Sequence, residues 1–267
     1  MDKIKRKLLQ VWQNRFFIFT AIKVDFKSRF SRSALGSVWA ILNPLVMVAI
    51  YAFILSQIMQ AKLAGIDNSY AYPIYLISGI IGWTLFTEIV TRSLTIFIEN
   101  AHYLKKLSFP HSNLIFIVLG VSFINSLILT LVSIIVFLIL GFPPTMSLLW
   151  LIPLSALTAL LALGVGVTCG VINVFVRDVG QVVPIILQLT FWLTPIVYTM
   201  NIIPVETRPM LSLNPIFGVI DMYHDVLAYQ VAPSIFSLIK LFTIAVVTNI
   251  IAYVLYRKAH NEIVEES

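Results

Sequence analysis

The chain has 267 residues, of which 59% are hydrophobic and only 11% are charged, and its formal net charge is +6. Soluble domains carry roughly 25% charged residues, so this composition excludes a soluble globular protein and indicates an integral membrane protein. The excess of Lys and Arg is explained by membrane topology and gives no reason to expect a nucleic-acid partner. The single cysteine, Cys169, cannot form an internal disulfide.

Residues 1–34 are predicted to form a cytoplasmic amphipathic helix that lies in the membrane interface. Apolar residues recur in this segment at helical spacing, from Ile4 to Phe26, with polar side chains between them. The alternative is a plain juxtamembrane anchor with no further role. Four basic residues crowd into the end of this segment, just before the first long apolar run; they are Lys23, Lys27, Arg29 and Arg32.

The rest of the chain, residues 35–267, is predicted to be one all-α polytopic domain. A membrane span needs about 20 apolar residues, and six segments qualify, namely 38–59, 73–97, 113–140, 148–175, 182–200 and 234–256. Pro184 and Pro195 should bend the fifth of these. Residues 201–233 are rich in proline and contain only a short apolar piece, which predicts a re-entrant or interfacial helical hairpin at the outer side.

The charge distribution predicts the orientation of the spans. With the N-terminus inside, 15 Lys and Arg residues fall on the inner flanks and 3 on the outer side. Positively charged loops stay in the cytoplasm, so both termini are expected to be cytoplasmic.

Several common kinds of site are missing from the sequence. It contains no GxxxxGK[ST] phosphate loop, no HExxH, no GxSxG and no His/Cys cluster with metal-ligand spacing. Nothing therefore indicates an enzyme or a metal site. The obvious acid within a span is Glu88, and Arg92 follows it by one helical turn. A structural ion pair is the favoured interpretation, ahead of a proton-coupling site.

Aromatic residues within the spans are candidates for a passage lining. Sugar rings have apolar C–H faces that stack on aromatic side chains, but Trp and Tyr also gather at both membrane interfaces, which leaves a lipid-facing belt as the alternative, especially for Trp83 and Tyr198. The candidate passage residues are Tyr51, Phe86, Phe191, Trp192 and Tyr198.

Four blocks of sequence carry a resemblance to a known family. They are KSRFSRSALGSVWAILNPL (27–45), SGIIGWTLFTE (78–88), IENAHYLKKLSFP (98–110) and VFVRDVGQVVPIILQLTFWLTPIVY (174–198) with LNPIFGVID (213–221). Their order and spacing resemble the permease subunits of polysaccharide-exporting ABC transporters, the ABC transmembrane type-2 family. The matching signature residues are Ser33, Leu35, Gly36, Trp39, Pro44, Arg177, Asp178, Asn214 and Pro215. Where family members often have Arg, this chain has His224.

The resemblance implies a homodimer of this chain in the bacterial inner membrane, with the passage lined by the first and fifth spans. Two separate ABC ATPase subunits would bind ATP and Mg, so this chain itself would hold no cofactor. Lys105, Lys106 and Pro110 would couple the ATPase to the permease. The substrate would be an undecaprenyl-linked glycan such as O-antigen, capsule or teichoic acid.

Two further expectations follow. Lys27, Arg29 and Arg32 would meet a lipid pyrophosphate at the cytoplasmic surface, because a basic cluster beside a membrane attracts anionic lipid head groups. The alternatives to glycan export are export of a small lipid or drug by the same architecture, and a passive channel or scaffold without an ATPase.

Overall fold

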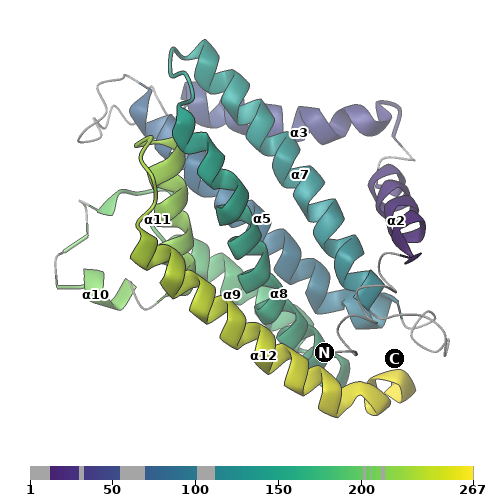
Figure 1. Cartoon of the computed structure of the whole chain (residues 1–267). Coiled ribbons are helices and arrows are strands. Elements are labelled where there is room, and N and C mark those ends of the chain that lie inside the picture. Colours follow the sequence, from purple (N-terminus) through teal and green to yellow (C-terminus); the bar gives the residue numbers. More distant parts are fainter. Residues whose placement is uncertain are drawn as a thin grey trace.

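The computed structural model describes residues 13–29, 33–54, 70–100, 112–200, 203–204, 206–211 and 214–266. Within these ranges all regular secondary structure is helical, with no β-strand (Figure 1). The prediction of an all-α membrane protein is confirmed.

Four helices are long and apolar enough to cross a membrane, and they correspond to the second, third, fourth and sixth predicted spans. They are α5 (Ala71–Glu99), α7 (Ser112–Ile139), α8 (Leu151–Phe175, preceded by the 3-10 turn η3, Met146–Trp150) and α12 (Ile235–Glu266). The end of α5, the start of α7, the end of α8 and the end of α12 lie at the same lower-right side of Figure 1. This arrangement agrees with the predicted alternation of the spans.

The first and fifth predicted spans correspond to shorter apolar helices. Gly36–Ala52 contains η1 (Gly36–Val38), α3 (Trp39–Ala49) and the start of the π-helix η2 (Ile50–Ile54), and the predicted end of this span at residue 59 lies outside the described residues. The other is α9 (Val179–Leu193). It ends earlier than predicted because Thr194 is extended, as a residue before proline prefers to be. The count of six spans stays a prediction.

Helix α8 is packed closely between α5 and α12. A side chain at Gly170 would collide with the Ser93 carbonyl of α5, and one at Gly164 would collide with Thr248 of α12. Asn173 adds a hydrogen bond to the Leu94 carbonyl at 3.0 Å. Small residues let membrane helices approach closely in this way. Consequently α5 is largely enclosed, with 72% of its apolar stretch buried against 17% for α12.

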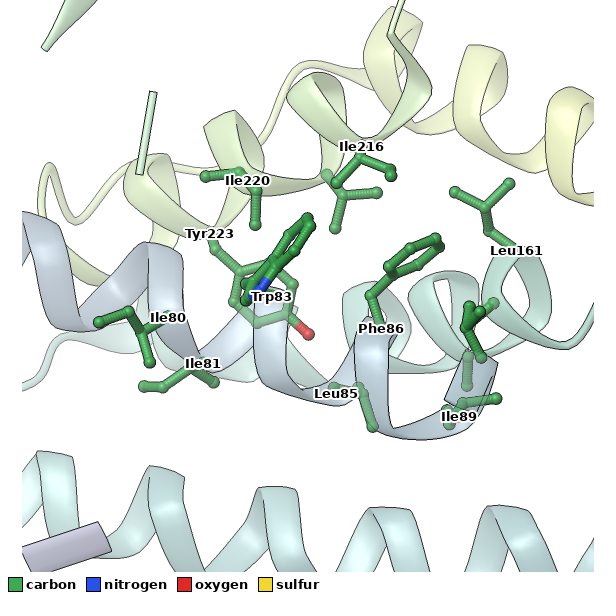
Figure 2. Close-up of a cluster of buried hydrophobic side chains, with 14 of the residues drawn as sticks. Ile80, Ile81, Trp83, Leu85, Phe86, Ile89, Leu161, Ile216, Ile220 and Tyr223 are labelled. Carbon is green, nitrogen blue, oxygen red and sulfur yellow. The ribbon is translucent and has the colours of Figure 1, made fainter. Parts of the chain in front are cut away.

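Residues 203–233 contain two helices in the part that the structure describes, α10 (Arg208–Leu211) and α11 (Pro215–Leu227). Helix α11 is amphipathic and turns its apolar side to α5 and α8, where Ile216, Ile220 and Tyr223 meet Phe86 and Leu161 (Figure 2). A helix of 13 residues is too short to cross a bilayer. Its burial is consistent with a hairpin that dips into the protein, and a re-entrant position stays a prediction.

The N-terminal helix α2 (Arg15–Ser28) lies beside α7 at the right of Figure 1, within the segment predicted to form an interface helix. Its apolar contact with α7 is tight, since a side chain at Gly120 would collide with Ile22. Phe16 and Phe19 are instead 72% and 69% exposed, as expected for side chains that face lipid. The N-terminal part of this prediction, residues 1–12, lies outside the described residues.

Candidate functional site

A groove of about 550 Å³ opens between α3, η2, α5 and α9. Aromatic and aliphatic side chains form most of its surface, together with three threonines and one glutamine. The lining residues are Met47, Tyr51, Ile80, Trp83, Thr84, Thr87, Thr91, Pro184, Leu187, Gln188, Phe191 and Trp192.

Three aromatic rings form a continuous wall of the groove. The ring centroids of Trp83 and Phe191 are 5.5 Å apart, and those of Phe191 and Trp192 are 5.4 Å apart in an edge-to-face arrangement. Such pairs hold one another in fixed orientations. The wall therefore joins α5 to α9 and presents flat apolar surfaces to whatever occupies the groove.

The predicted passage residues do not all lie here. Tyr51, Phe191 and Trp192 line the groove, and their role in a substrate passage stays a prediction. Phe86 is 1% exposed and points into the core beside Leu161 (Figure 2), so it contributes to packing and does not line the groove. Tyr198 lies after the end of α9, where its hydroxyl donates to the Trp192 carbonyl at 3.1 Å.

Sequence reasoning missed the polar side of the groove. Thr84, Thr87 and Thr91 stand on one face of α5, three and four residues apart. Their hydroxyls donate to the carbonyls of Ile80, Trp83 and Thr87 at 2.8, 2.9 and 2.8 Å. The helical spacing of these threonines was visible in the sequence and is the signal that would have found them.

A cluster of four charged side chains lies beside this polar face and ties α2 to α5. Arg92 donates to Glu88 at 3.0 Å and to Asp25 at 3.2 Å. Arg29 reaches Glu88 at 3.3 Å and Asp25 at 3.9 Å. Asn125 of α7 donates to the same Glu88 oxygen at 2.5 Å. The predicted Glu88–Arg92 ion pair is thus confirmed, and it is part of a larger network that balances two positive against two negative charges.

This network changes the surroundings of the predicted pyrophosphate-binding residues. Arg29 is engaged by two carboxylates, whereas Lys27 is exposed near the end of α2. Arg32 lies outside the described residues, as do all three predicted coupling residues, Lys105, Lys106 and Pro110.

The signature around Ser33 forms the turn between α2 and α3. The indole of Trp39 donates to the Ser33 hydroxyl at 2.8 Å, and the Gly36 amide donates to the Ser33 carbonyl at 3.0 Å. Gly36 has φ +51°, a conformation that glycine adopts without the steric cost that a Cβ brings. Leu35 is exposed, and Pro44 lies within α3. These residues therefore determine how the chain enters the first apolar helix.

The other signature residues also lie at helix starts. The carbonyls of Arg177 and Asp178 accept the first amides of the turn that leads into α9, from Gly180 at 3.1 Å and Gln181 at 2.9 Å. Asn214 caps α11, where its side-chain oxygen accepts from the Ile216 amide at 3.0 Å, and Pro215 occupies the first turn. Asn at the N-cap followed by Pro is a favoured helix start.

His224, the residue that departs from the family pattern, is buried in α11. Its ring stacks on Tyr75 at 3.6 Å, and a Cβ at Gly79 would come within 2.7 Å of its Nε2. Burial lowers the pKa of the imidazole to about 3, so the ring is neutral. The tight fit explains why a residue without a fixed charge occupies this position here.

Within the described residues no group of three or more His, Cys, Asp or Glu side chains is arranged to hold a metal ion. The groove is lined mainly by aromatic and aliphatic side chains, with the hydroxyl groups of three threonines along one side.

Comparison with known proteins identifies the family. Residues 16–227 match the ABC-2 type transporter family, which covers more than half of the chain. The chain belongs to this family. It is 33% identical to an O-antigen export system permease protein RfbA of Klebsiella pneumoniae over 75% of this chain and 76% of that protein. The RfbA permease of Myxococcus xanthus is 24% identical over 91% and 92% of the two chains. The polysialic acid transport protein KpsM of Escherichia coli is 25% identical over 87% and 89%.

The ABC-2 family membership accounts for both the helical bundle and the absence from the sequence of an ATP-binding loop, because the permease subunits of such transporters are not themselves catalytic.

Proposed function

We propose that this chain is the permease subunit of an ATP-driven exporter that moves a lipid-linked polysaccharide from the cytoplasmic side across the bacterial inner membrane. The observation that carries the proposal is the groove between α3, α5 and α9, in a chain whose relatives bear the names of O-antigen and polysialic acid transporters. Its aromatic wall suits the C–H faces of sugar rings, and its polar side suits their hydroxyls.

Two copies of the chain would form the complete passage. The groove is open on one side, and Trp192 at its edge is 60% exposed. A second copy facing this opening would turn the groove into a channel and shield the aromatic wall from lipid. Both termini would be cytoplasmic, and the segment 201–233 would lie at the outer mouth.

A separate ATPase subunit would supply the energy for transport. Its docking would involve the loop with Lys105, Lys106 and Pro110. The lipid carrier would be undecaprenyl pyrophosphate, met at the cytoplasmic surface by Lys27 and Arg32. Arg29 would contribute less, since Glu88 and Asp25 already engage its guanidinium.

Deletion of the gene in its host, with complementation, tests the proposal. Surface glycan should disappear and lipid-linked glycan should accumulate in the cell, and the wild-type gene should reverse both effects. Unchanged surface glycan would contradict the proposal, and accumulation of a small lipid or drug would favour the alternative cargo. Purification from the complemented strain should also capture an ABC ATPase, whereas transport without ATP would indicate a passive channel.

Charge reversal of the loop tests the coupling role. The double substitution Lys105→Glu and Lys106→Glu should leave ATP hydrolysis in place and abolish export. Wild-type export in this variant would remove these two residues from the coupling mechanism.

A further inference from the structure

The three threonines of α5 that line the groove all form the same kind of hydrogen bond. The hydroxyl of each lies within 2.8–2.9 Å of a carbonyl oxygen one turn earlier in the helix. A carbonyl can only accept, so each hydroxyl proton is donated to the backbone. What remains for the groove is the acceptor capacity of the three oxygens.

These acceptors form a row along the groove. Thr84 and Thr91 are seven residues apart, which corresponds to about 10 Å along an α-helix. Thr87 lies between them on the same face. The row faces α9, which contributes Gln188 and the rings of Phe191 and Trp192 to the same groove. A ligand lying along α5 would therefore meet equivalent acceptors at successive positions.

The described lining contains no charged side chain. The nearest charged groups on α5, Glu88 and Arg92, neutralise each other and the two charges of α2. An anionic group in the groove would lose hydration without gaining an ionic partner, which is costly. A ligand with many hydroxyl donors and no charge loses little by comparison.

We propose that Thr84, Thr87 and Thr91 form a row of hydrogen-bond acceptors for the hydroxyl groups of an uncharged glycan segment, and that this row selects neutral over acidic sugars. The inference rests on the proposed function and specifies the substrate class of the same groove. Because the acceptors are equivalent and each bond is weak, a sugar chain can exchange one threonine for the next as it moves.

The first test is export in the complemented host strain. Simultaneous Thr84→Val, Thr87→Val and Thr91→Val substitutions keep side-chain shape and remove the acceptors. Each lost neutral hydrogen bond weakens binding by about threefold to tenfold, so surface glycan should fall by about tenfold or more. The matched Ser variant at the same three positions, which can bond back to the helix in the same way, should export like the wild type.

Thr243 provides a control for replacing a threonine hydroxyl by a methyl group outside the groove. Its hydroxyl also donates to a carbonyl one turn earlier, at 2.9 Å from Ile239, but it lies on α12 away from the groove. Thr243→Val should leave export unchanged. Normal export by the triple Val variant, or equal loss in the triple Ser variant, would overturn the acceptor row. So would loss of the assembled complex in the Val variant, because that would assign the threonines to the contact between copies.

The second test uses the purified transporter with its ATPase and two oligosaccharides of equal length. Maltohexaose, which is neutral, should quench the tryptophan fluorescence of the groove saturably, and the triple Val substitution should weaken this binding by about tenfold. Hexagalacturonate, which carries a carboxylate on each sugar, should bind at least about tenfold more weakly than maltohexaose. Equal or tighter binding of hexagalacturonate, or no saturable binding of maltohexaose, would overturn the preference for neutral sugars.

The two tests separate this inference from the proposed function. If the wild-type gene fails to restore surface glycan, the proposed function fails whatever the binding result. If export is restored and the Val variant matches the wild type, only the acceptor row fails.

Discussion

The first half of α5, residues 71–82, and its second half, residues 83–99, belong to one continuous helix, yet different contacts hold them. The first half is covered by α11, where Gly79 and Gly82 receive the rings of His224 and Tyr223. The second half packs on α8 through Ser93, and its other side carries the threonine row and the ion pairs of Glu88 and Arg92. Close packing resists any change of volume, whereas ion pairs respond to changes of charge.

This contrast has a functional meaning for the proposed exporter. The first half is held by α11 and by residues 195–197. Gly79 and Gly82 leave no room for a side chain, and Tyr72 and Tyr75 donate to the carbonyls of Val197 and Pro195. The second half contacts α2 mainly through ion pairs between side chains, and such contacts can break and form again without repacking a core. Movement of α2 relative to α5 would therefore be opposed by the charge network and by the contact of Ile22 with Gly120 of α7.

Among the changes tested at neutral pH, adding volume at Gly82 should have the largest effect on stability. A Cβ here would lie 2.6 Å from the Tyr223 ring, so Gly82→Leu forces the α5–α11 contact apart and should cost about 3 kcal/mol. Thermal unfolding of the purified transporter measures the loss. Tyr223→Ala in the same chain should recover part of it by making space. A Gly82→Leu variant as stable as the wild type would contradict the close-packing account.

Removing the Glu88 charge should have the next largest effect. Glu88→Gln leaves Arg29 and Arg92 with too few negative partners and should cost about 2 kcal/mol, less than for a fully enclosed pair because Asp25 and Arg29 are more than a third exposed. Proteolysis at Lys23 and Lys27 should become faster as α2 loosens. The matched change Glu99→Gln, at the exposed end of α5, should affect neither measurement. Unchanged proteolysis in Glu88→Gln would separate α2 from the network.

Acid should destabilise the first half through His224. The pKa of the buried ring is lowered to about 3 from its usual 6.5, so the unfolded chain binds a proton that the folded chain excludes. The contribution of the neutral ring to the free energy of unfolding is therefore fully present above about pH 6.5. Below that pH it falls by up to about 1.4 kcal/mol per pH unit. The difference between wild type and His224→Gln in melting experiments from pH 7 to pH 4 isolates this contribution. A constant difference across that range would contradict it.

Loss of the α11 cap should have the smallest effect. Asn214→Ala removes the acceptor for the Ile216 amide and should cost about 1 kcal/mol, whereas Asn214→Ser, which can still cap, should cost less. Melting temperatures of the two variants provide the comparison. Equal stability of both variants would show that the cap contributes nothing to the cover over the first half of α5.

The sequence predicted the long spans well, because a continuous apolar run that can reach across a bilayer is rare outside membrane proteins. It also predicted the Glu88–Arg92 pair, which is local on one helix. The contributions of Asp25 and Asn125 to the same network could not be predicted, since they come from distant positions in the chain that only the tertiary fold brings together.

The groove was predicted only in part, and the reason is physical. In a membrane helix, apolar side chains face both lipid and protein, so an aromatic residue does not reveal which side it occupies. Phe191 lines the groove and Phe86 packs in the core, although both lie in similar apolar surroundings in the sequence. The close fit of His224 against Gly79 was equally hidden, because the two residues are on different helices.

The charge network also bears on the order in which the protein is made. Helix α2 leaves the ribosome before α5 and α7, since Arg92 follows Asp25 by 67 residues and Asn125 comes later still. Until α5 and α7 are synthesised and inserted, Arg29 and Asp25 have only each other as partners from this network. Helix α2 can therefore make all of its contacts in this network only after α5 and α7 have followed it out of the ribosome.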